Sequence, residues 1–136
     1  MVLDTSALIA MLLAEPERDA YVALLAEAED PMISAATLVD ASIVMLAKTA
    51  EAGIRDLDEL LRTGGVRCVA VDDEQARLAR DAFARFGKGR SAAGLNYGDC
   101  FSYALARSTN QPLLFKGEDF SKTDVTPAIN EPTSPH

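Results

Sequence analysis

Short apolar runs alternate along the chain with longer segments in which apolar residues recur every three or four positions. This pattern is typical of β-strands that alternate with α-helices. The expected strands are residues 1–3, 32–34, 66–71 and 111–115. The expected helices are residues 7–13, 15–29, 36–47, 54–62, 73–86 and 97–106. Alternation of this kind predicts an α/β domain with a central, mainly parallel sheet.

Segment 36–47 differs from the other expected helices because almost all of its residues are apolar. A helix that is apolar nearly all round is expected to be buried on all sides. Asp40 lies in its middle, where an ionised carboxylate without a partner is strongly unfavourable. Asp40 is therefore a functional residue, or else it faces solvent on a narrow strip or pairs with an arginine.

Asp99 is expected in the first turn of the helix that follows Asn96, whose side chain can cap that helix. The Asp99 carboxylate has two interpretations. It complements the positive end of the helix dipole, or it belongs to a functional site.

Two further expectations concern the packing of the core. Asp72 caps the helix 73–86, and the buried stripe of that helix is expected to be Ala76, Ala79, Phe83 and Phe86, with Leu78 and Ala82 widening it on one side. Cys68 and Cys100 have apolar neighbours, so we expect two buried, reduced thiols.

The 136 residues suffice for one domain, expected over residues 1–130 and followed by a disordered tail at 131–136. No apolar run is long enough to span a membrane, and the first residues lack the basic start of a secretory signal. We therefore expect a cytoplasmic protein with no membrane partner. The net charge of −8 argues against tight, non-specific binding of nucleic acid through phosphate contacts alone. It does not exclude a metal-dependent nuclease, because four acids around a metal would leave a charge of −4.

Four acids from distant parts of the sequence are predicted to converge. Asp4 follows the first expected strand, and Asp119 follows the last. Asp40 and Asp99 lie on helices that adjoin the second and last strands. In parallel α/β sheets, ligands bind outside the carboxyl ends of the strands. The pattern therefore predicts a cluster of carboxylates at one edge of the sheet.

Clustered carboxylates repel one another, and protonation or a bound cation must relieve the repulsion. Oxygen ligands without His or Cys suit Mg²⁺ or Mn²⁺. The single histidine, His136, lies in the tail, which argues against a zinc site. A site of acids with Mg²⁺ suits phosphodiester hydrolysis, because the ion activates water and stabilises charge on phosphate.

Five further residues are candidates for contact with a substrate or its water. Thr5 and Ser6 lie beside Asp4 and could hold a metal-bound water, although Ser6 is equally the expected cap of the helix 7–13. Lys88 and Arg90 belong to a glycine-rich basic loop and could contact a backbone phosphate. Lys116 follows the last expected strand.

Four segments carry a resemblance to a known family. They are Val-Leu-Asp-Thr-Ser-Ala at 2–7, Ser-Ala-Ala-Thr-Leu-Val-Asp at 34–40, Gly-Leu-Asn-Tyr-Gly-Asp-Cys-Phe-Ser-Tyr at 94–103 and Leu-Leu-Phe-Lys-Gly-Glu-Asp-Phe at 113–120. From residue 1 to about residue 126, the chain resembles a PIN domain, and more closely the VapC-type toxins of bacterial toxin–antitoxin pairs. The resemblance implies a three-layer α/β/α fold and a Mg²⁺- or Mn²⁺-dependent endoribonuclease. It also implies a homodimer that a cognate VapB-type antitoxin holds inactive.

The resemblance assigns roles to the four acids. Asp4 and Asp99 would be the principal metal ligands, and Asp40 would be the acid on the third helix. Asp119 would be the fourth acid, or would position a water molecule.

The chain departs from the family pattern at two positions. Most relatives carry Glu where this chain has Asp40, so the shorter side chain is expected to reach a metal through water. Many PIN domains place the fourth acid two residues before Asp119, where this chain has Gly117. Glu118 is therefore the alternative to Asp119.

Two other functions fit parts of the sequence. A receiver-type phosphoacceptor domain also carries acids at strand ends and a basic residue after the last strand, but it needs an acidic pair after the first strand, where Thr5 and Ser6 stand here. A catalytically silent PIN-like binding module would carry Asp40 as a degraded site residue.

Overall fold

The structure is a computed structural model that describes residues 1–129. The tail expected at 131–136 lies outside the described residues. The strands are β1 (Val2–Leu3), β2 (Met32–Ser34), β3 (Arg67–Val69) and β4 (Leu113–Leu114). The helices are α1 (Thr5–Leu12), α2 (Arg18–Glu27), α3 (Ala35–Thr63), α4 (Asp73–Phe86), α5 (Tyr97–Thr109) and a 3₁₀ turn, η1 (Phe120–Lys122). No helix within residues 1–129 combines the length and apolar character needed to cross a bilayer.

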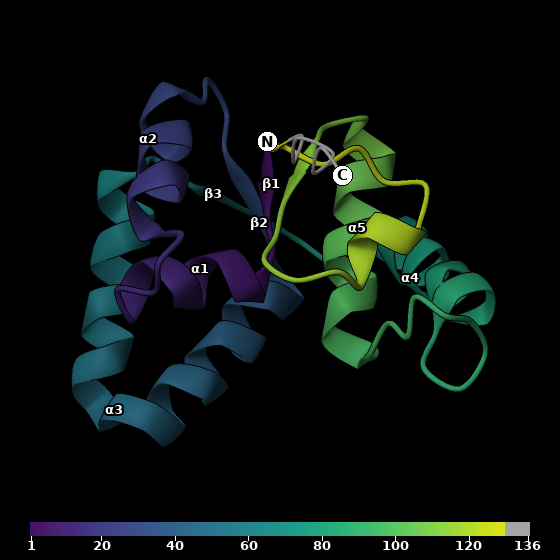
Figure 1. Ribbon diagram of the computed structural model, residues 1–136, viewed down its shortest axis with the longest axis horizontal. Helices are drawn as coiled ribbons and strands as arrows, with labels where there is room; N and C mark the ends of the chain where they lie inside the picture. The colour runs from purple at the N-terminus through teal and green to yellow at the C-terminus, as the bar shows by residue number, and fades with distance from the viewer. Residues whose placement is uncertain (130–136) are drawn as a thin grey trace, which may run out of the picture.

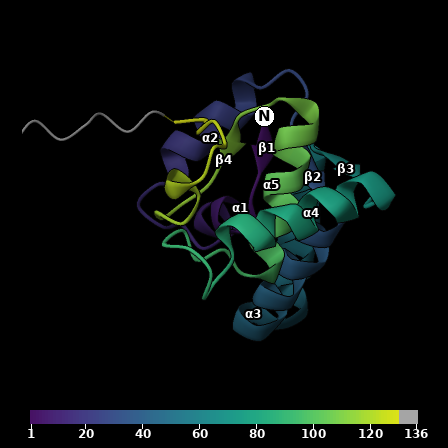
Figure 2. The same cartoon turned by 90° about the vertical axis from the view of Figure 1, so that its right-hand side faces the viewer.

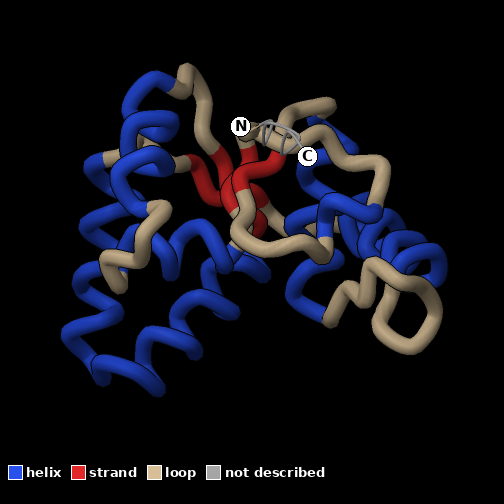
Figure 3. The backbone as a smooth tube through the Cα atoms, viewed as in Figure 1, coloured by secondary structure: helices blue, strands red, loops and turns tan. Residues whose placement is uncertain are grey.

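The four strands form one parallel sheet in the order β3-β2-β1-β4. Helices α1, α2 and α3 lie on one side of this sheet, and α4 and α5 lie on the other (Figures 1 and 2). Figure 3 shows the strands enclosed between the two helical layers. The expected three-layer α/β/α domain is therefore confirmed, and the sheet is parallel throughout.

Successive residues of each strand supply two separate cores, because neighbouring side chains point to opposite faces of a sheet. Val2 and Leu113 pack with α4 and α5, whereas Leu3 and Leu114 pack with α1, α2 and α3. All four side chains are fully buried, as expected for parallel strands covered on both faces. β3 is an edge strand, and Cys68 on it is exposed, so the expected burial of this thiol is wrong.

Helix α3 confirms one expectation and corrects another. The helices expected at 36–47 and 54–62 are both present within α3, and a kink separates them where Ala50 adopts a non-helical φ of 56°. The first of the two is not buried on all sides. Only one face packs against the core, with Thr37, Ala41 and Met45 buried at four-residue spacing, while Val39 and Ile43 are 57% and 61% exposed.

The buried face of α4 lies on the side where Leu78 and Ala82 are expected to widen the stripe. Ala79 and Ala82 are buried as expected and Gln75 is buried beside them, whereas Ala76 is exposed and Phe83 is 40% exposed. The Gln75 amide donates a hydrogen bond to the hydroxyl of Ser108 on α5, which satisfies a polar group that faces the other helix.

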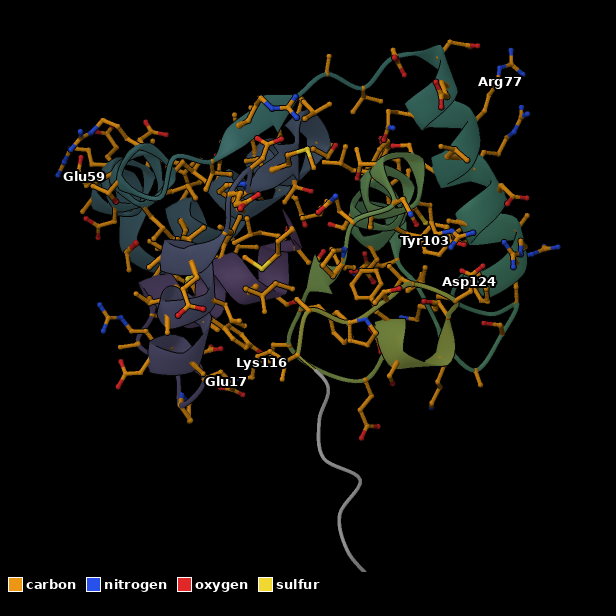
Figure 4. All side chains as sticks on the ribbon, turned by 90° about the horizontal axis from the view of Figure 1, so that it is seen from above. Glu17, Glu59, Arg77, Tyr103, Lys116 and Asp124 are labelled. Atoms are coloured by element: carbon orange, nitrogen blue, oxygen red, sulfur yellow. The ribbon has the colours of Figure 1, made fainter. Side chains whose placement is uncertain are left out.

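A polar cluster fastens the segment after β4 to α4 and α5. The Tyr103 hydroxyl donates a hydrogen bond of 2.5 Å to the Asp124 carboxylate, and the two side chains point toward one another in Figure 4. Arg85 and Arg107 form ion pairs with the same carboxylate at 3.4 and 3.8 Å. Burial tends to raise the pKa of Asp124, but Tyr103 and the two arginines outweigh it and hold that pKa below its usual value.

Replacing Tyr103 by Phe is expected to lower the free energy of unfolding by about 1–2 kcal/mol, because it removes a hydrogen bond to a charged group. Urea denaturation at neutral pH measures this change. The effect should become smaller at low pH, where Asp124 is protonated and the hydrogen bond is no longer made to a charged group. A Tyr103→Phe protein as stable as the original at neutral pH would show that the hydrogen bond contributes nothing.

Candidate functional site

Asp4 lies directly after β1 and is almost fully buried, with 3% of its surface exposed. Its carboxylate oxygen Oδ2 accepts hydrogen bonds from the backbone N–H of Ser6 at 3.0 Å and from the Ser6 hydroxyl at 2.7 Å. Asp4 is therefore the N-cap of α1, and the expectation that Ser6 caps this helix is wrong. The Ser6 hydroxyl also accepts a hydrogen bond from the backbone N–H of Lys116, which joins the segment after β4 to Asp4.

The second oxygen of Asp4 is held from the opposite side by α5. The hydroxyl of Ser102, which is fully buried, donates a hydrogen bond of 2.6 Å to Asp4 Oδ1. Thr37 on α3 lies 3.3 Å from the same hydroxyl. Because the one hydroxyl proton of Ser102 is donated to Asp4, the Thr37 hydroxyl is the donor in this second contact. Burial raises the pKa of Asp4, and the bonds from Ser102 and Ser6 oppose that rise.

Sequence reasoning missed Ser102 and Thr37 as parts of the site. Both are small polar residues in helical segments that are otherwise apolar. Only their positions could have indicated that they belong to the site. Ser102 lies one helical turn after Asp99, and Thr37 lies three residues before Asp40.

Asp99 occupies the third position of α5. The Asn96 side chain accepts a hydrogen bond from the Asp99 backbone, and the Asp99 side chain accepts one from the Asn96 backbone, so that the two form a capping box. The predicted cap is confirmed. Asp99 therefore stabilises the start of α5, as the dipole interpretation states. Its carboxylate also lies near other acids.

The pKa of Asp99 is raised to about 7, first by burial and then by the negative charges of Asp4, Asp119 and Asp40, against the opposing hydrogen bond from Asn96. Three carboxylates from remote parts of the chain therefore lie close enough to Asp99 to act on its ionisation. The charges of the other three predicted acids therefore act on Asp99, and no lysine or arginine of the described residues forms an ion pair with any of the four.

Asp40 projects from α3 toward the first turn of α5. It is half-buried, and its Oδ2 accepts a hydrogen bond of 2.7 Å from the Thr5 hydroxyl. The same oxygen lies against Gly98, the residue before Asp99. Asp40 therefore neither pairs with an arginine nor stands alone on the surface.

Asp119 is exposed at the start of η1. Its charge is among those that raise the pKa of Asp99, so Asp119 stays the predicted fourth acid, with Glu118 as the alternative. Gly117 has a φ of 99°, in the left-handed region that an aspartate adopts only with strain. The turn therefore explains why an acid is not found at that position.

The three basic candidates lie in different settings. Lys116 forms ion pairs with Glu15 at 2.9 Å and with Glu17 at 3.3 Å, and Figure 4 shows Lys116 and Glu17 side by side. Lys88 and Arg90 are exposed in the loop that leads into α5 and have no acidic partner within residues 1–129. The Arg90 guanidinium donates to the Ala84 carbonyl at the end of α4.

The donor set of the cluster suits a hard divalent cation. Its ligands are carboxylate oxygens with adjacent hydroxyl groups, and such ligands favour Mg²⁺ and Mn²⁺. In the described part of the chain, no three Asp, Glu, Cys or His side chains already stand at the spacing of a closed metal site. An ion would therefore have to draw the exposed Asp119 and the half-buried Asp40 and Asp99 toward Asp4, which its hydrogen bonds hold in place.

Comparison with known proteins gives one family model, one close relative and two similar solved structures. The family model described as PIN domain matches residues 1–125. A protein of Mycolicibacterium smegmatis named ribonuclease VapC is 54% identical over 127 residues, which cover 92% of this chain and 97% of that protein. Among solved structures, Mycobacterium tuberculosis VapC20, described as a sarcin-ricin loop cleaving toxin, has a TM-score of 0.75 at 17% identity. The alignment covers 92% of this chain and 95% of the VapC20 chain. VapBC2 of Rickettsia felis, solved bound to a promoter DNA fragment, has a TM-score of 0.73 at 15% identity, covering 93% of this chain and 94% of its own.

Proposed function

The chain belongs to the PIN-domain family and, within it, to the VapC ribonucleases, and from this premise we propose that it hydrolyses RNA phosphodiester bonds at the acid cluster with Mg²⁺ or Mn²⁺. The observation that carries the proposal is the environment of Asp99. Three further carboxylates raise its pKa, and no lysine or arginine within residues 1–129 forms an ion pair with any of the four acids. A receiver-type phosphoacceptor is excluded by the family.

In the proposed mechanism, Asp4 and Asp99 are the principal metal ligands, and Asp40 and Asp119 complete the negative site. When bound, the divalent ion supplies the acidity that activates a water molecule and stabilises charge on the phosphate. Ser6 and Ser102 hold both oxygens of Asp4 in place, so its orientation is fixed before anything binds.

The Thr5 hydroxyl likewise donates to Oδ2 of Asp40 and orients that carboxylate. Because Ser6 already donates to Asp4, it has no further proton for a bound water, and its proposed role shifts from substrate contact to orientation of Asp4.

The proposed contacts to RNA come from the basic loop before α5. Lys88 and Arg90 are exposed there, and two or three cations near an acidic site can hold the phosphates on either side of the scissile bond. Lys116 would have to leave Glu15 and Glu17 to make a similar contact.

We also propose that a VapB-type antitoxin controls the protein, since the chain is a VapC ribonuclease and the Rickettsia felis structure contains such a toxin–antitoxin pair. The homodimer stays a prediction. The exposed apolar side chains of Val39 and Ile43 on α3 are of the kind that partners cover.

RNA cleavage by the purified protein, freed of antitoxin, is expected to stop when EDTA removes divalent ions and to return when Mg²⁺ or Mn²⁺ is added in excess. The reason is that carboxylates are negatively charged and cannot stabilise the negative charge that develops on the phosphate, whereas a divalent cation can. Gel analysis of labelled RNA measures the cleavage.

Two outcomes would contradict this proposal. Cleavage that continues in EDTA would remove the metal from the mechanism. Intact RNA under every metal condition, from a folded protein that still binds antitoxin, would establish the catalytically silent PIN-like module instead.

A further inference from the structure

Gly98 is the residue of α5 that faces Asp40. A Cβ atom at this position would lie 2.7 Å from Asp40 Oδ2 and 3.1 Å from its Cγ, both closer than ordinary contact permits. The backbone does not itself require glycine, because Gly98 is absent from the glycines with positive φ. The reason for glycine is therefore space for the Asp40 carboxylate.

The oxygen that a side chain at position 98 would displace is also the one that Thr5 holds. Asp40 Oδ2 accepts the Thr5 hydroxyl at 2.7 Å and lies between Thr5 and Gly98. A methyl group at position 98 would push this oxygen out of its place. Aspartate has a single methylene, so its carboxylate can lie beside α5 only if the two helices approach closely, and glycine allows that approach.

We propose that Gly98 is a positioning residue that sets where the Asp40 carboxylate lies relative to Asp99 and thereby tunes the affinity of the acid cluster for a divalent cation. This inference rests on the proposed function, because it assigns Asp40 to the same metal site. Gly98 acts through Asp40 and makes no contact of its own with substrate or ion.

A purely structural role makes a different prediction. The atom in contact is the end of a side chain rather than backbone, so alanine at position 98 can be accommodated by movement of Asp40 alone. Glycine within a helix is also less stable than alanine, by up to about 1 kcal/mol. Gly98→Ala is therefore expected to fold and to unfold at the same temperature or higher, while its cation site is impaired.

The test is a double-mutant cycle in which isothermal titration calorimetry measures Mn²⁺ affinity without RNA. Wild type, Gly98→Ala, Asp40→Ala and the double variant are compared. Gly98→Ala is expected to weaken Mn²⁺ binding by about tenfold, the scale seen when a residue that orients a ligand is lost. On the Asp40→Ala background, the same substitution should change the affinity by less than about twofold, because the residue through which it acts is gone.

Gly64→Ala is the matched control. Gly64 ends α3 in a helical conformation, and a Cβ there would also meet the end of a side chain, Leu25 Cδ2, at 2.8 Å. Gly64 and Leu25 lie outside the acid cluster, so this variant should bind Mn²⁺ as wild type does. Equal weakening by both glycine variants would assign the effect to altered packing and overturn the inference.

The remaining outcomes separate this inference from the proposed function. Unchanged Mn²⁺ affinity in Gly98→Ala, with binding and cleavage intact in wild type, would overturn the positioning role alone. Weakening of the same size on both backgrounds would show that Gly98 does not act through Asp40 and would also overturn it. Wild-type protein that cleaves RNA but binds no Mn²⁺ would overturn the proposed metal mechanism, and the inference with it.

Discussion

Asp99→Asn is expected to lower RNA cleavage by about 10³-fold and, at the same time, to stabilise the protein when no metal is bound. The loss of cleavage follows from removal of a proposed ligand charge. The gain in stability follows from the pKa of Asp99, which lies at about 7 in the folded protein. The unfolded chain ionises this group near pH 4, so between pH 4 and 7 the folded state holds a proton that the unfolded state has lost. The stability that this group provides is therefore present at low pH and is lost as the pH rises to about 7.

Asparagine carries no charge and keeps an oxygen that can accept the Asn96 N–H. At pH 8, Asp99→Asn is expected to raise the free energy of unfolding by about 1–3 kcal/mol, a range reduced from the full pKa shift because the carboxylate is partly exposed. Urea denaturation in EDTA at pH 5 and pH 8 measures the change, which should be roughly a third as large at the lower pH. Asp56→Asn is the control, because Asp56 is an exposed acid on α3 that forms no ion pair within residues 1–129. Full cleavage by Asp99→Asn, or destabilisation at pH 8, would contradict the assignment.

Asp4→Ala is expected to abolish cleavage and to change stability in the opposite direction. Asp4 caps α1 and accepts the buried hydroxyl of Ser102. Its loss removes the cap and leaves buried donors without an acceptor, and each of these effects is worth about 1–2 kcal/mol. We expect the free energy of unfolding to fall by about 2–4 kcal/mol, an upper range because relief of a buried charge offsets part of the loss.

The same urea experiment in EDTA at pH 7 measures this second effect. Asp72→Ala is a suitable control, because Asp72 caps α4 through the Gln75 N–H but lies outside the acid cluster. The control should lose the stability of a helix cap and keep its cleavage. An Asp4→Ala protein as stable as wild type would show that the hydrogen bonds to Asp4 do not hold the site together.

The proximity of Asp4, Asp40 and Asp119 to Asp99, which shows in the raised pKa of Asp99, has a basis in the sequence, whereas a metal site made of these four acids stays a prediction. Asp4 and Asp119 follow buried apolar runs, and parallel strands place their carboxyl ends at one edge of the sheet. The capping box of Asp99 was predictable for a similar reason, because it depends on residues three positions apart.

The sequence was not sufficient to find the hydroxyl groups that orient the acids. Ser102 and Thr37 meet across 65 positions of sequence, and their contact depends on how α3 and α5 cross. Small polar residues within apolar helices are compatible with a core, a surface or a site. The contact of Gly98 with Asp40 depends on the same crossing and could not be predicted either.

Apolar periodicity also failed to decide which apolar side chains are covered. Ile43 is exposed on α3, and Phe83 is partly exposed on α4, although both lie in helical apolar patterns. Gln75 occupies the interface of α4 because Ser108 satisfies its amide. Lys116 is a predicted substrate contact, and its ion pairs with Glu15 and Glu17, a hundred residues earlier in the chain, could not be predicted.

The most direct test of the acid cluster is a crystal of the wild-type protein soaked in Mn²⁺ and measured for anomalous scattering. The account predicts an anomalous peak at coordination distance from carboxylate oxygens of both Asp4 and Asp99, and no such peak in a crystal of Asp99→Asn soaked in the same way. A wild-type crystal of active protein with no Mn²⁺ between Asp4 and Asp99, or with Mn²⁺ bound only elsewhere, would contradict it.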